Sequence, residues 1–197
     1  MRFKDTRVLY IVAHADDEWV MLQHLKTARR VKIVIVTEDR KIQAVRKSES
    51  LAHGTSAGFR AEDYVFLSDQ ISIPDLQAIN AIELIRDAVL KAIDAQSFDQ
   101  IITHDFEAGH PDHDAVHLTC RLIAKQLNIP VMSYCSYRSG PFGLPILFRR
   151  LEKKTNTIKL RYSIRQLWHM LKGAMKFKSQ WKAMGILSTY GLTTILM

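Results

Sequence analysis

Short apolar segments that alternate with helix-like segments constrain this chain more than any other feature of its sequence. Five runs are rich in apolar and β-branched residues, which is typical of buried strands: Arg7–Ala13, Val31–Thr37, Tyr64–Leu67, Asp99–Thr103 and Pro130–Tyr137. The segments between them have helical spacing: Glu18–Arg30, Ile42–Ala57, Pro74–Ala95 and Pro111–Leu127. Buried strands separated by helices predict an α/β fold, a Rossmann-like three-layer α/β/α domain with a mostly parallel sheet.

The chain length of 197 residues favours a single domain spanning 1–197, because domains run to roughly 100–200 residues. We expect its core to be residues 1–138 and its last part, residues 146–197, to be a basic helical extension. Ser139–Pro145 is a cluster of turn-forming residues between the two. Ser163–Met184 has the pattern of an amphipathic helix, and we expect the aromatic residues on its apolar side to pack in the core.

Positive charge is concentrated in this extension. The net charge is +8, and from Arg149 onward there are 11 Lys or Arg residues against one acid, Glu152. An acidic partner and a merely solvated basic surface both fit this pattern. Nucleic-acid binding is the weakest of the alternatives. A basic amphipathic helix beside the uncharged residues 183–197 would suit an anionic membrane, but we expect at most weak, salt-sensitive peripheral contact.

Two cysteines and the N-terminal pattern bear on location. Cys120 and Cys135 are too few for a disulfide framework and suit a reducing compartment. The apolar run Val8–Ala13 is too short for a signal segment and ends in His14 and acids. We therefore expect a cytoplasmic protein. The alternative is a cytoplasmic protein in peripheral contact with the inner face of the membrane. The sequence does not indicate an oligomeric state.

Polar clusters follow the predicted strands. Residues 14–18 (HADDE) come after the first strand, His104-Asp105 after the fourth, and residues 110–113 (HPDH) open the next helix. Because carboxyl ends of parallel strands share one edge of a sheet, we expect these clusters to meet. Zinc binds imidazole nitrogen and carboxylate oxygen, so the clusters predict a metal site. The alternative is that the acids only complement helix dipoles.

These motifs resemble the LmbE/PIG-L family of zinc-dependent N-deacetylases. The family signature Ala-His-Pro-Asp-Asp-Glu is similar to residues 13–18 (AHADDE), and His-Pro-Asp-His is intact at 110–113. The family also has a helix with Arg-x-x-Glu followed by a glycine, which Arg46, Glu49 and Gly58 match. After the sheet it has a Lys and then a Ser-Gln pair, which are similar to Lys172, Ser179 and Gln180. Ala15 replaces the usual proline. Residues 37–39 (TED) replace the usual Thr-Asp-Gly after the second strand, in a loop that commonly lies near the substrate in this family.

The resemblance implies roles for individual residues. His14, Asp17 and His113 would bind one zinc ion or another divalent metal per chain. Asp16 would be the general base, and a protonated His110 would stabilise the oxyanion. Asp112 would orient and charge His110. Weaker candidates for substrate contact, each with a structural alternative, are Arg46, Asp69 and His104.

The implied reaction is removal of an N-acetyl group from an amino sugar or sugar conjugate of the N-acetylglucosamine type. The substrate could carry a phosphate or a lipid. The alternative reaction is zinc-dependent cleavage of another amide, such as a larger acyl group or a thiol conjugate. A dinucleotide-dependent oxidoreductase is disfavoured because no GxGxxG motif follows the first strand.

Overall fold

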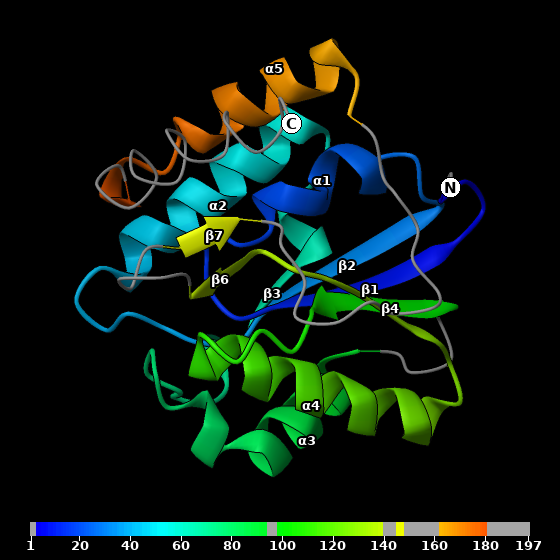
Figure 1. Ribbon diagram of the computed structural model, residues 1–197, viewed down its shortest axis with the longest axis vertical. Helices are drawn as coiled ribbons and strands as arrows, with labels where there is room; N and C mark the ends of the chain where they lie inside the picture. Colours follow the sequence, from blue (N-terminus) through cyan, green and yellow to red (C-terminus); the bar gives the residue numbers. More distant parts are fainter. Residues whose placement is uncertain (1–2, 94–97, 140–144, 148–161, 181–197) are drawn as a thin grey trace.

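A computed structural model describes residues 3–93, 98–139, 145–147 and 162–180. Its main sheet has five parallel strands in the order β3-β2-β1-β4-β5 (Figure 1). The strands are β1 (Arg7–Val12), β2 (Arg30–Ile35), β3 (Tyr64–Phe66), β4 (Gln100–His104) and β5 (Val131–Tyr134). The predicted α/β fold with a parallel sheet is confirmed.

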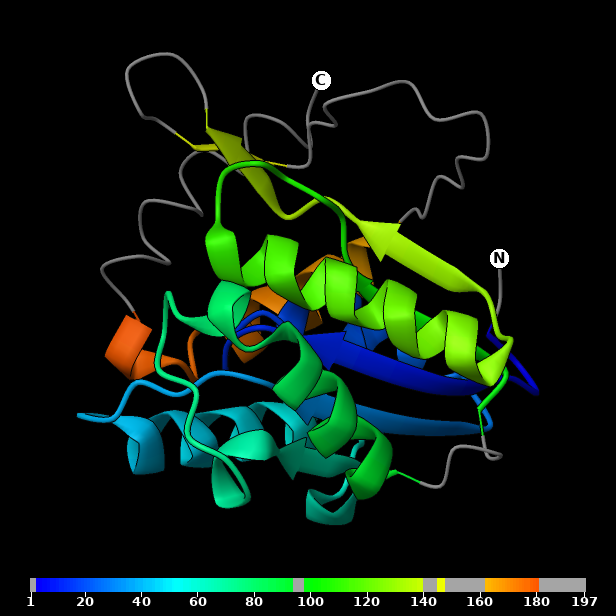
Figure 2. The same cartoon turned by 90° about the horizontal axis from the view of Figure 1, so that it is seen from below.

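Helices cover both faces of this sheet (Figures 1 and 2). One layer contains α1 (Trp19–Leu25) and α2 (Gln43–Ala57), with α5 (Ile164–Ala174) lying on them, and the other contains α3 (Ile82–Ala92) and α4 (Pro111–Leu127). Alternate residues of β1 pack against the two helix layers, because successive side chains of a strand point to opposite faces of the sheet. Leu9 and Ile11 pack in one core, and Val8, Tyr10 and Val12 in the other. None of the helices in the described ranges is long and apolar enough to cross a membrane.

The order of the strands reverses between β1 and β4. From β1 the chain adds β2 and β3 on one side and then returns to place β4 on the other side. Val8 pairs with Gln100 and Tyr10 with Ile102, so the residues after the two strands emerge side by side. Ligands in open parallel sheets bind in the crevice at such a reversal.

The segment before α3 differs from the prediction of one helix over Pro74–Ala95. The helix begins only at Ile82, after a 3-10 turn η3 (Ala78–Asn80), and ends at Ala92. Leu76 has a φ of 69°, a left-handed conformation that a right-handed helix does not contain. The backbone N–H groups of Leu76 and Ala78 donate to the Asp112 carboxylate. The first part of the predicted helix is therefore wrong, because its amides bind a side chain from α4.

The chain after the sheet also departs from its predicted bounds. Strand β5 ends at Tyr134, and Tyr137 belongs to β6 (Tyr137–Ser139), which pairs antiparallel with β7 (Pro145–Leu147) in a separate small sheet. The predicted strand over Pro130–Tyr137 is thus too long. Similarly, α1 ends at Leu25 rather than Arg30, which already begins β2.

The C-terminal helix is present but shorter than predicted. Ser163 and Gln166 form a capping box at the start of α5, which ends at Ala174 before a 3-10 turn η6 (Lys178–Gln180). Residues 181–184 of the predicted helix and the basic stretch Arg149–Arg161 lie outside the described residues. The expectation of one basic helical extension over 146–197 therefore stays a prediction.

The expected core packing of the aromatic residues in the predicted helix Ser163–Met184 holds only in part, and Trp181 lies outside the described residues. Phe177 is fully buried, but Trp168 is 57% exposed. The reason is the position of α5 outside α1 and α2. Met170 and Gly173 face those helices, so the opposite side of α5 meets no further layer among the described elements.

Candidate metal centre

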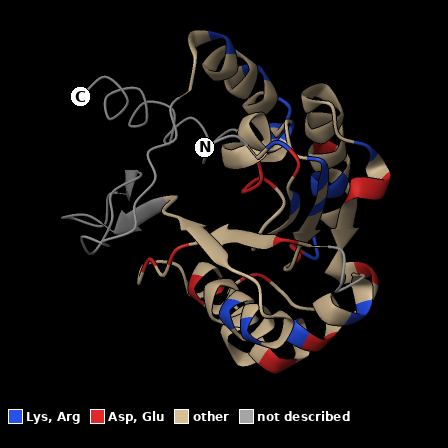
Figure 3. Cartoon of the chain, turned by 90° about the vertical axis from the view of Figure 1, so that its right-hand side faces the viewer, with Lys and Arg blue, Asp and Glu red and all other residues tan. Residues whose placement is uncertain are grey.

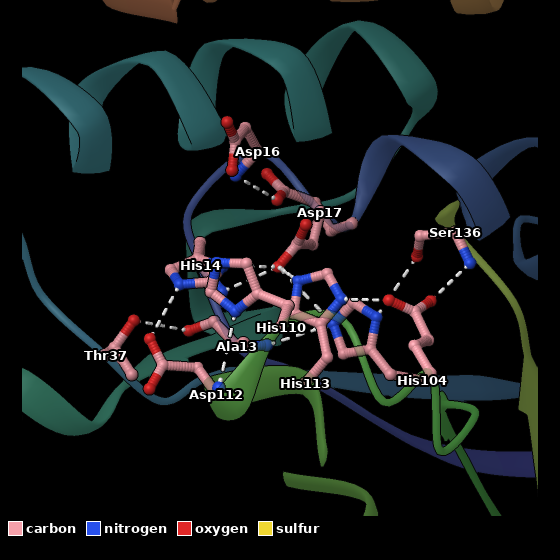
Figure 4. A network of polar contacts seen from close by, with 12 residues as sticks. Ala13, His14, Asp16, Asp17, Thr37, His104, His110, Asp112, His113 and Ser136 are labelled. Atoms are coloured by element: carbon pink, nitrogen blue, oxygen red, sulfur yellow. Dashed lines mark hydrogen bonds and ion pairs between the residues drawn. The ribbon is translucent and has the colours of Figure 1, made fainter. Parts of the chain in front are cut away.

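The loop after β1 carries the first group of polar residues. The buried Glu18 carboxylate accepts the Asp16 backbone N–H at 2.9 Å and ties the loop to the start of α1. Asp16 has a φ of 150°, which a non-glycine residue adopts only under strain, and such strain clusters at functional sites. The His14 backbone N–H donates to Asp17 Oδ2 at 2.8 Å. The Asp17 carboxylate points toward the histidines, whereas Asp16 lies apart from them (Figure 4).

The start of α4 carries the second group. Pro111 suits the first turn of a helix because its missing N–H would have no helical partner there. His110 is the N-cap residue, and Asp112 and His113 lie in the first turn. His110 and Asp112 contact His14, just after β1, and His113 stacks on His104, the last residue of β4. Two clusters that lie about 100 residues apart in sequence are therefore in contact.

Three histidines surround one oxygen of Asp17. Asp17 Oδ2 lies 3.0 Å from His14 Nδ1 and 3.4 Å from His113 Nε2. His104 Nε2 is also 3.4 Å away. The ligand atoms of His14, Asp17 and His113 all lie within 4.8 Å of one another. The structure thus brings together the three residues that the family resemblance implied as ligands.

His14 and His113 are each held by a buried carboxylate at the ring nitrogen that faces away from Asp17. His14 Nε2 lies 3.0 Å from Asp112 Oδ2, and His113 Nδ1 lies 2.8 Å from Glu107 Oε2. Asp112 is fully buried and Glu107 is 1% exposed. A carboxylate that accepts the far N–H of a histidine fixes the ring and turns its other nitrogen to a metal. Both near nitrogens, His14 Nδ1 and His113 Nε2, face Asp17.

The electrostatics of this centre favour a cation. Burial would lower the pKa of His14, but Asp17 and Asp112 raise it to about 10. Burial would likewise lower that of His113, but Asp17 and Glu107 raise it to about 9. Burial would raise the pKa of Asp17, yet the histidines hold it well below its usual range. A metal ion binds by replacing the protons that His14 and His113 would otherwise hold.

The spacing of the donors also fits a metal ion. Zinc–ligand distances of about 2.0–2.2 Å in a tetrahedron give ligand–ligand separations of about 3.3–3.6 Å. Asp17 Oδ2 lies 3.4 Å from His113 Nε2, within that range, and 3.0 Å from His14 Nδ1, slightly closer than that range. Two imidazoles and a carboxylate can therefore hold a divalent metal such as zinc.

Asp16 lies beside the centre and is paired with a buried arginine. Arg46, from α2, donates to Asp16 Oδ1 at 3.2 Å and to Asp75 Oδ2 at 3.1 Å. Glu49, one turn further along α2, instead accepts the Ser179 backbone N–H at 2.9 Å. Burial and then the charge of Asp17 raise the pKa of Asp16 to about 6. A carboxyl group that titrates near neutrality suits proton transfer.

His110 differs from its expected state. Its Nδ1 accepts the Asp112 backbone N–H at 3.3 Å, which leaves the ring proton of the neutral form on Nε2. Burial and then the charges of His14 and His113 lower its pKa to about 4. His110 is therefore neutral at pH 7 rather than protonated. The expected orientation of His110 by Asp112 comes from the Asp112 backbone, while the Asp112 carboxylate contacts His14.

His104 and Asp69, the two remaining candidates for substrate contact, lie in different environments. His104 is fully buried, accepts the Ala13 backbone N–H at 3.2 Å and stacks on His113 at 3.8 Å between ring centres. Its burial favours a role in positioning other groups over direct contact with substrate. Asp69 ends the 3-10 turn η2 (Leu67–Asp69), forms an ion pair with Lys47 and has a side chain that is 60% exposed.

Sequence reasoning missed Glu107, Asp75 and Ser136. The second oxygen of Glu107 accepts the Ser136 backbone N–H at 2.6 Å, so this carboxylate links the loop after β4 to the chain after β5. An acid three residues before the HPDH motif was the available signal. No spacing rule relates such a loop residue to a histidine on the next helix.

Comparisons with known proteins bear on the family and the fold of this chain. The family model described as PIG-L: GlcNAc-PI de-N-acetylase matches residues 9–124. No curated protein sequence matches the chain. One similar solved structure is Dbv21, the deacetylase of the A40926 pseudoaglycone, with 14% identity, a TM-score of 0.62 and coverage of 90% of this chain and 84% of that one.

Two further solved structures are similar in fold. A deacetylase–teicoplanin complex has 12% identity, a TM-score of 0.62 and coverage of 89% of this chain and 88% of that one. The zinc-inhibited form of the teicoplanin deacetylase Orf2 has 14% identity, a TM-score of 0.54 and coverage of 89% and 85%. At these identities the likeness is one of fold.

Proposed function

The chain belongs to the PIG-L family of GlcNAc-PI de-N-acetylases and is a metal-dependent N-deacetylase acting on amino sugars, and we propose that it deacetylates an N-acetylglucosamine unit within a larger glycoconjugate. We propose that His14, Asp17 and His113 hold one divalent metal, with zinc the best match to two imidazoles and one carboxylate. The solved deacetylases of teicoplanin and the A40926 pseudoaglycone support a glycoconjugate substrate, because they share the fold.

Proton transfer in this proposal belongs to Asp16. A bound divalent metal supplies Lewis acidity, which polarises the amide carbonyl and lowers the pKa of water. Asp16, outside the metal ligands, takes a proton from the attacking water, and its pKa of about 6 suits that step. The proton that Asp16 has taken is then available to the leaving amine.

The developing oxyanion is assigned to His110. The neutral ring carries its proton on Nε2 and can donate it as a hydrogen bond to the carbonyl oxygen. This donation needs no positive charge on the ring. Arg46, Asp112 and Glu107 do not react in this scheme: they hold Asp16, His14 and His113 in place.

The observation that carries the proposal is the convergence of His14 and His113 on Asp17, each held from behind by a buried carboxylate. The test combines metal analysis with an assay of amine release. We expect about one equivalent of divalent metal in the purified protein and loss of that metal in His14→Ala and in His113→Ala. Stoichiometric metal retained in both variants would refute this ligand set.

Substrate class is tested with a panel of N-acetylglucosamine compounds. The panel contains the free sugar and its nucleotide-linked, lipid-linked and thiol-precursor conjugates, and an N-acyl series in which acetyl is replaced by longer chains. Release of acetate from at least one conjugate, at a higher kcat/KM than from the free sugar, is the expected result. Cleavage of longer acyl amides alone would contradict the deacetylase proposal.

A further inference from the structure

The outward side of α5 carries a continuous apolar stripe. The stripe consists of Ile164, Trp168, Leu171 and Met175, which are 88%, 57%, 42% and 59% exposed. Their spacing of three or four residues places them along one side of the helix. Exposed apolar residues scattered singly are ordinary, but a contiguous row on one helix marks an interaction surface.

The inward side of α5 is firmly docked, so the stripe has a fixed outward direction. A Cβ atom on Gly173 would lie 2.3 Å from His53 Nε2, which means that α5 and α2 approach each other at that glycine. Phe177 is fully buried and its ring meets that of His53 at 5.2 Å. Ser179 binds Glu49, and the Tyr162 hydroxyl donates to the Val20 carbonyl. The stripe therefore does not result from a loosely attached helix.

Positive charge borders the stripe. Arg165 and Lys172 lie on α5, and Lys176 and Lys178 follow it, with all four exposed and no acid on the helix (Figure 3). Lys172 Nζ lies 5.1 Å from the centre of the Trp168 ring, so the charge directly adjoins the apolar side chains. The wider segment from Arg149 to Lys182 contains 11 basic residues and a single acid in the sequence.

We propose that α5 docks this enzyme on an anionic membrane surface. The apolar stripe inserts between lipid headgroups, and the bordering bases pair with lipid phosphates, as in amphipathic helices that lie in the plane of a membrane. Each Lys or Arg near such a surface contributes about 1 kcal/mol. A second copy of the chain fits less well, because two α5 surfaces would bring like charges together. The inference goes beyond the proposed function, and membrane docking requires neither metal nor turnover.

Vesicle co-sedimentation of the full chain tests this docking. Vesicles of phosphatidylcholine alone are compared with vesicles that also contain phosphatidylglycerol, each at low and high salt. We expect binding to the phosphatidylglycerol vesicles at low salt and a strong reduction at high salt, because salt screens charge between the bases and the lipids. Absence of binding at low salt, or equal binding to both kinds of vesicle, would overturn the proposal.

Matched variants assign the binding to α5. Ile164→Gln combined with Trp168→Gln should reduce partitioning at least about tenfold, since two exposed apolar side chains are lost. Arg165→Gln combined with Lys178→Gln should reduce it roughly tenfold to thirtyfold. The control is Leu84→Gln on α3, a residue that is 49% exposed in the opposite layer and should leave partitioning unchanged.

Two results contradict the assignment to α5. Equal partitioning of the stripe variant and the Leu84→Gln control would show that another part of the chain carries the binding. Sedimentation velocity without lipid covers the alternative of a second copy. A dimer in the unmodified protein that the stripe variant converts to a monomer, without any change in vesicle binding, would assign the stripe to self-association. Failure of vesicle binding alone leaves the deacetylase assignment intact, because metal content and amine release are measured separately.

Discussion

Asp16 and Asp17 are neighbours in sequence, yet the loop after β1 turns their carboxylates to different partners. Asp17 faces three histidines, and Asp16 faces Arg46. We expect Asp16→Asn to keep its metal and lose about 10²–10⁴-fold in turnover, because only the proton acceptor is removed. Asp17→Asn should lose metal. Metal analysis and amine release decide between them, and a reversed pattern would exchange the two assignments.

His110 touches the centre through its ring but lies outside the proposed ligand set. Its removal should leave metal content unchanged and lower kcat about 10²–10³-fold, the usual effect of losing one donor to an oxyanion. His110→Ala is measured for metal, kcat and KM. Full activity would eliminate the donor role, and loss of metal would make His110 a ligand instead.

Glu107 connects His113, a proposed metal ligand, to the chain after β5 through Ser136. Replacing its carboxylate by an amide weakens the acceptor for the His113 Nδ1–H, so Glu107→Gln should lower metal affinity about 10–100-fold. Affinity is measured by competition with a chelator, and the absorption spectrum of the cobalt-loaded protein should change. Glu38→Gln, also at a buried carboxylate, is the control and should retain metal. Unchanged affinity and spectrum in Glu107→Gln would reduce Glu107 to a packing residue.

At the level of elements, α2 and α5 approach each other at a single glycine. Gly to Ala normally favours a helix by about 1 kcal/mol, but at Gly173 the added methyl would overlap the His53 ring. We expect Gly173→Ala to lower the free energy of unfolding by about 1–3 kcal/mol. Urea denaturation measures this. The double variant with His53→Ala should be more stable than the sum of the single effects predicts, because the ring that clashes is gone. Purely additive effects would contradict a contact at this position.

For the whole molecule, burial of His53 predicts a decline in stability toward acid pH. Burial, and then the charge of Lys176, lower the pKa of His53 to about 4. The unfolded chain, with a pKa of about 6.5, therefore binds a proton below that pH which the folded protein does not bind. Stability falls from about pH 6.5 to pH 4, by up to about 3 kcal/mol from this residue. His53→Gln should show a shallower decline in urea denaturation across that range, since all other titrating groups are shared. Identical slopes would contradict the pKa shift.

The sequence by itself determined the β–α alternation, the parallel sheet and the meeting of two motif clusters. These features follow from local chemistry: apolar runs can be buried only as inner strands, and carboxyl ends of parallel strands share one edge. A candidate zinc site could be recognised because residues 14–18 and 110–113 are compact motifs. They contain histidine and acidic residues, whose imidazole nitrogens and carboxylate oxygens are ligands of zinc. Family resemblance added the proposed roles of individual residues within the motifs.

Only the tertiary structure decided which group supports which. Glu107 reaches His113 and Arg46 reaches Asp16 through contacts between separate elements, and no periodicity in the sequence encodes them. The backbone amides of Leu76 and Ala78 donate to the buried Asp112 carboxylate and so do not continue the helix of α3. Burying that carboxylate without hydrogen-bond donors would cost more free energy than one turn of helix contributes. The direction of α5 was likewise settled by packing. Its amphipathic pattern shows that one side is apolar, but a glycine that admits the His53 ring determines which side meets the protein and leaves Trp168 outside.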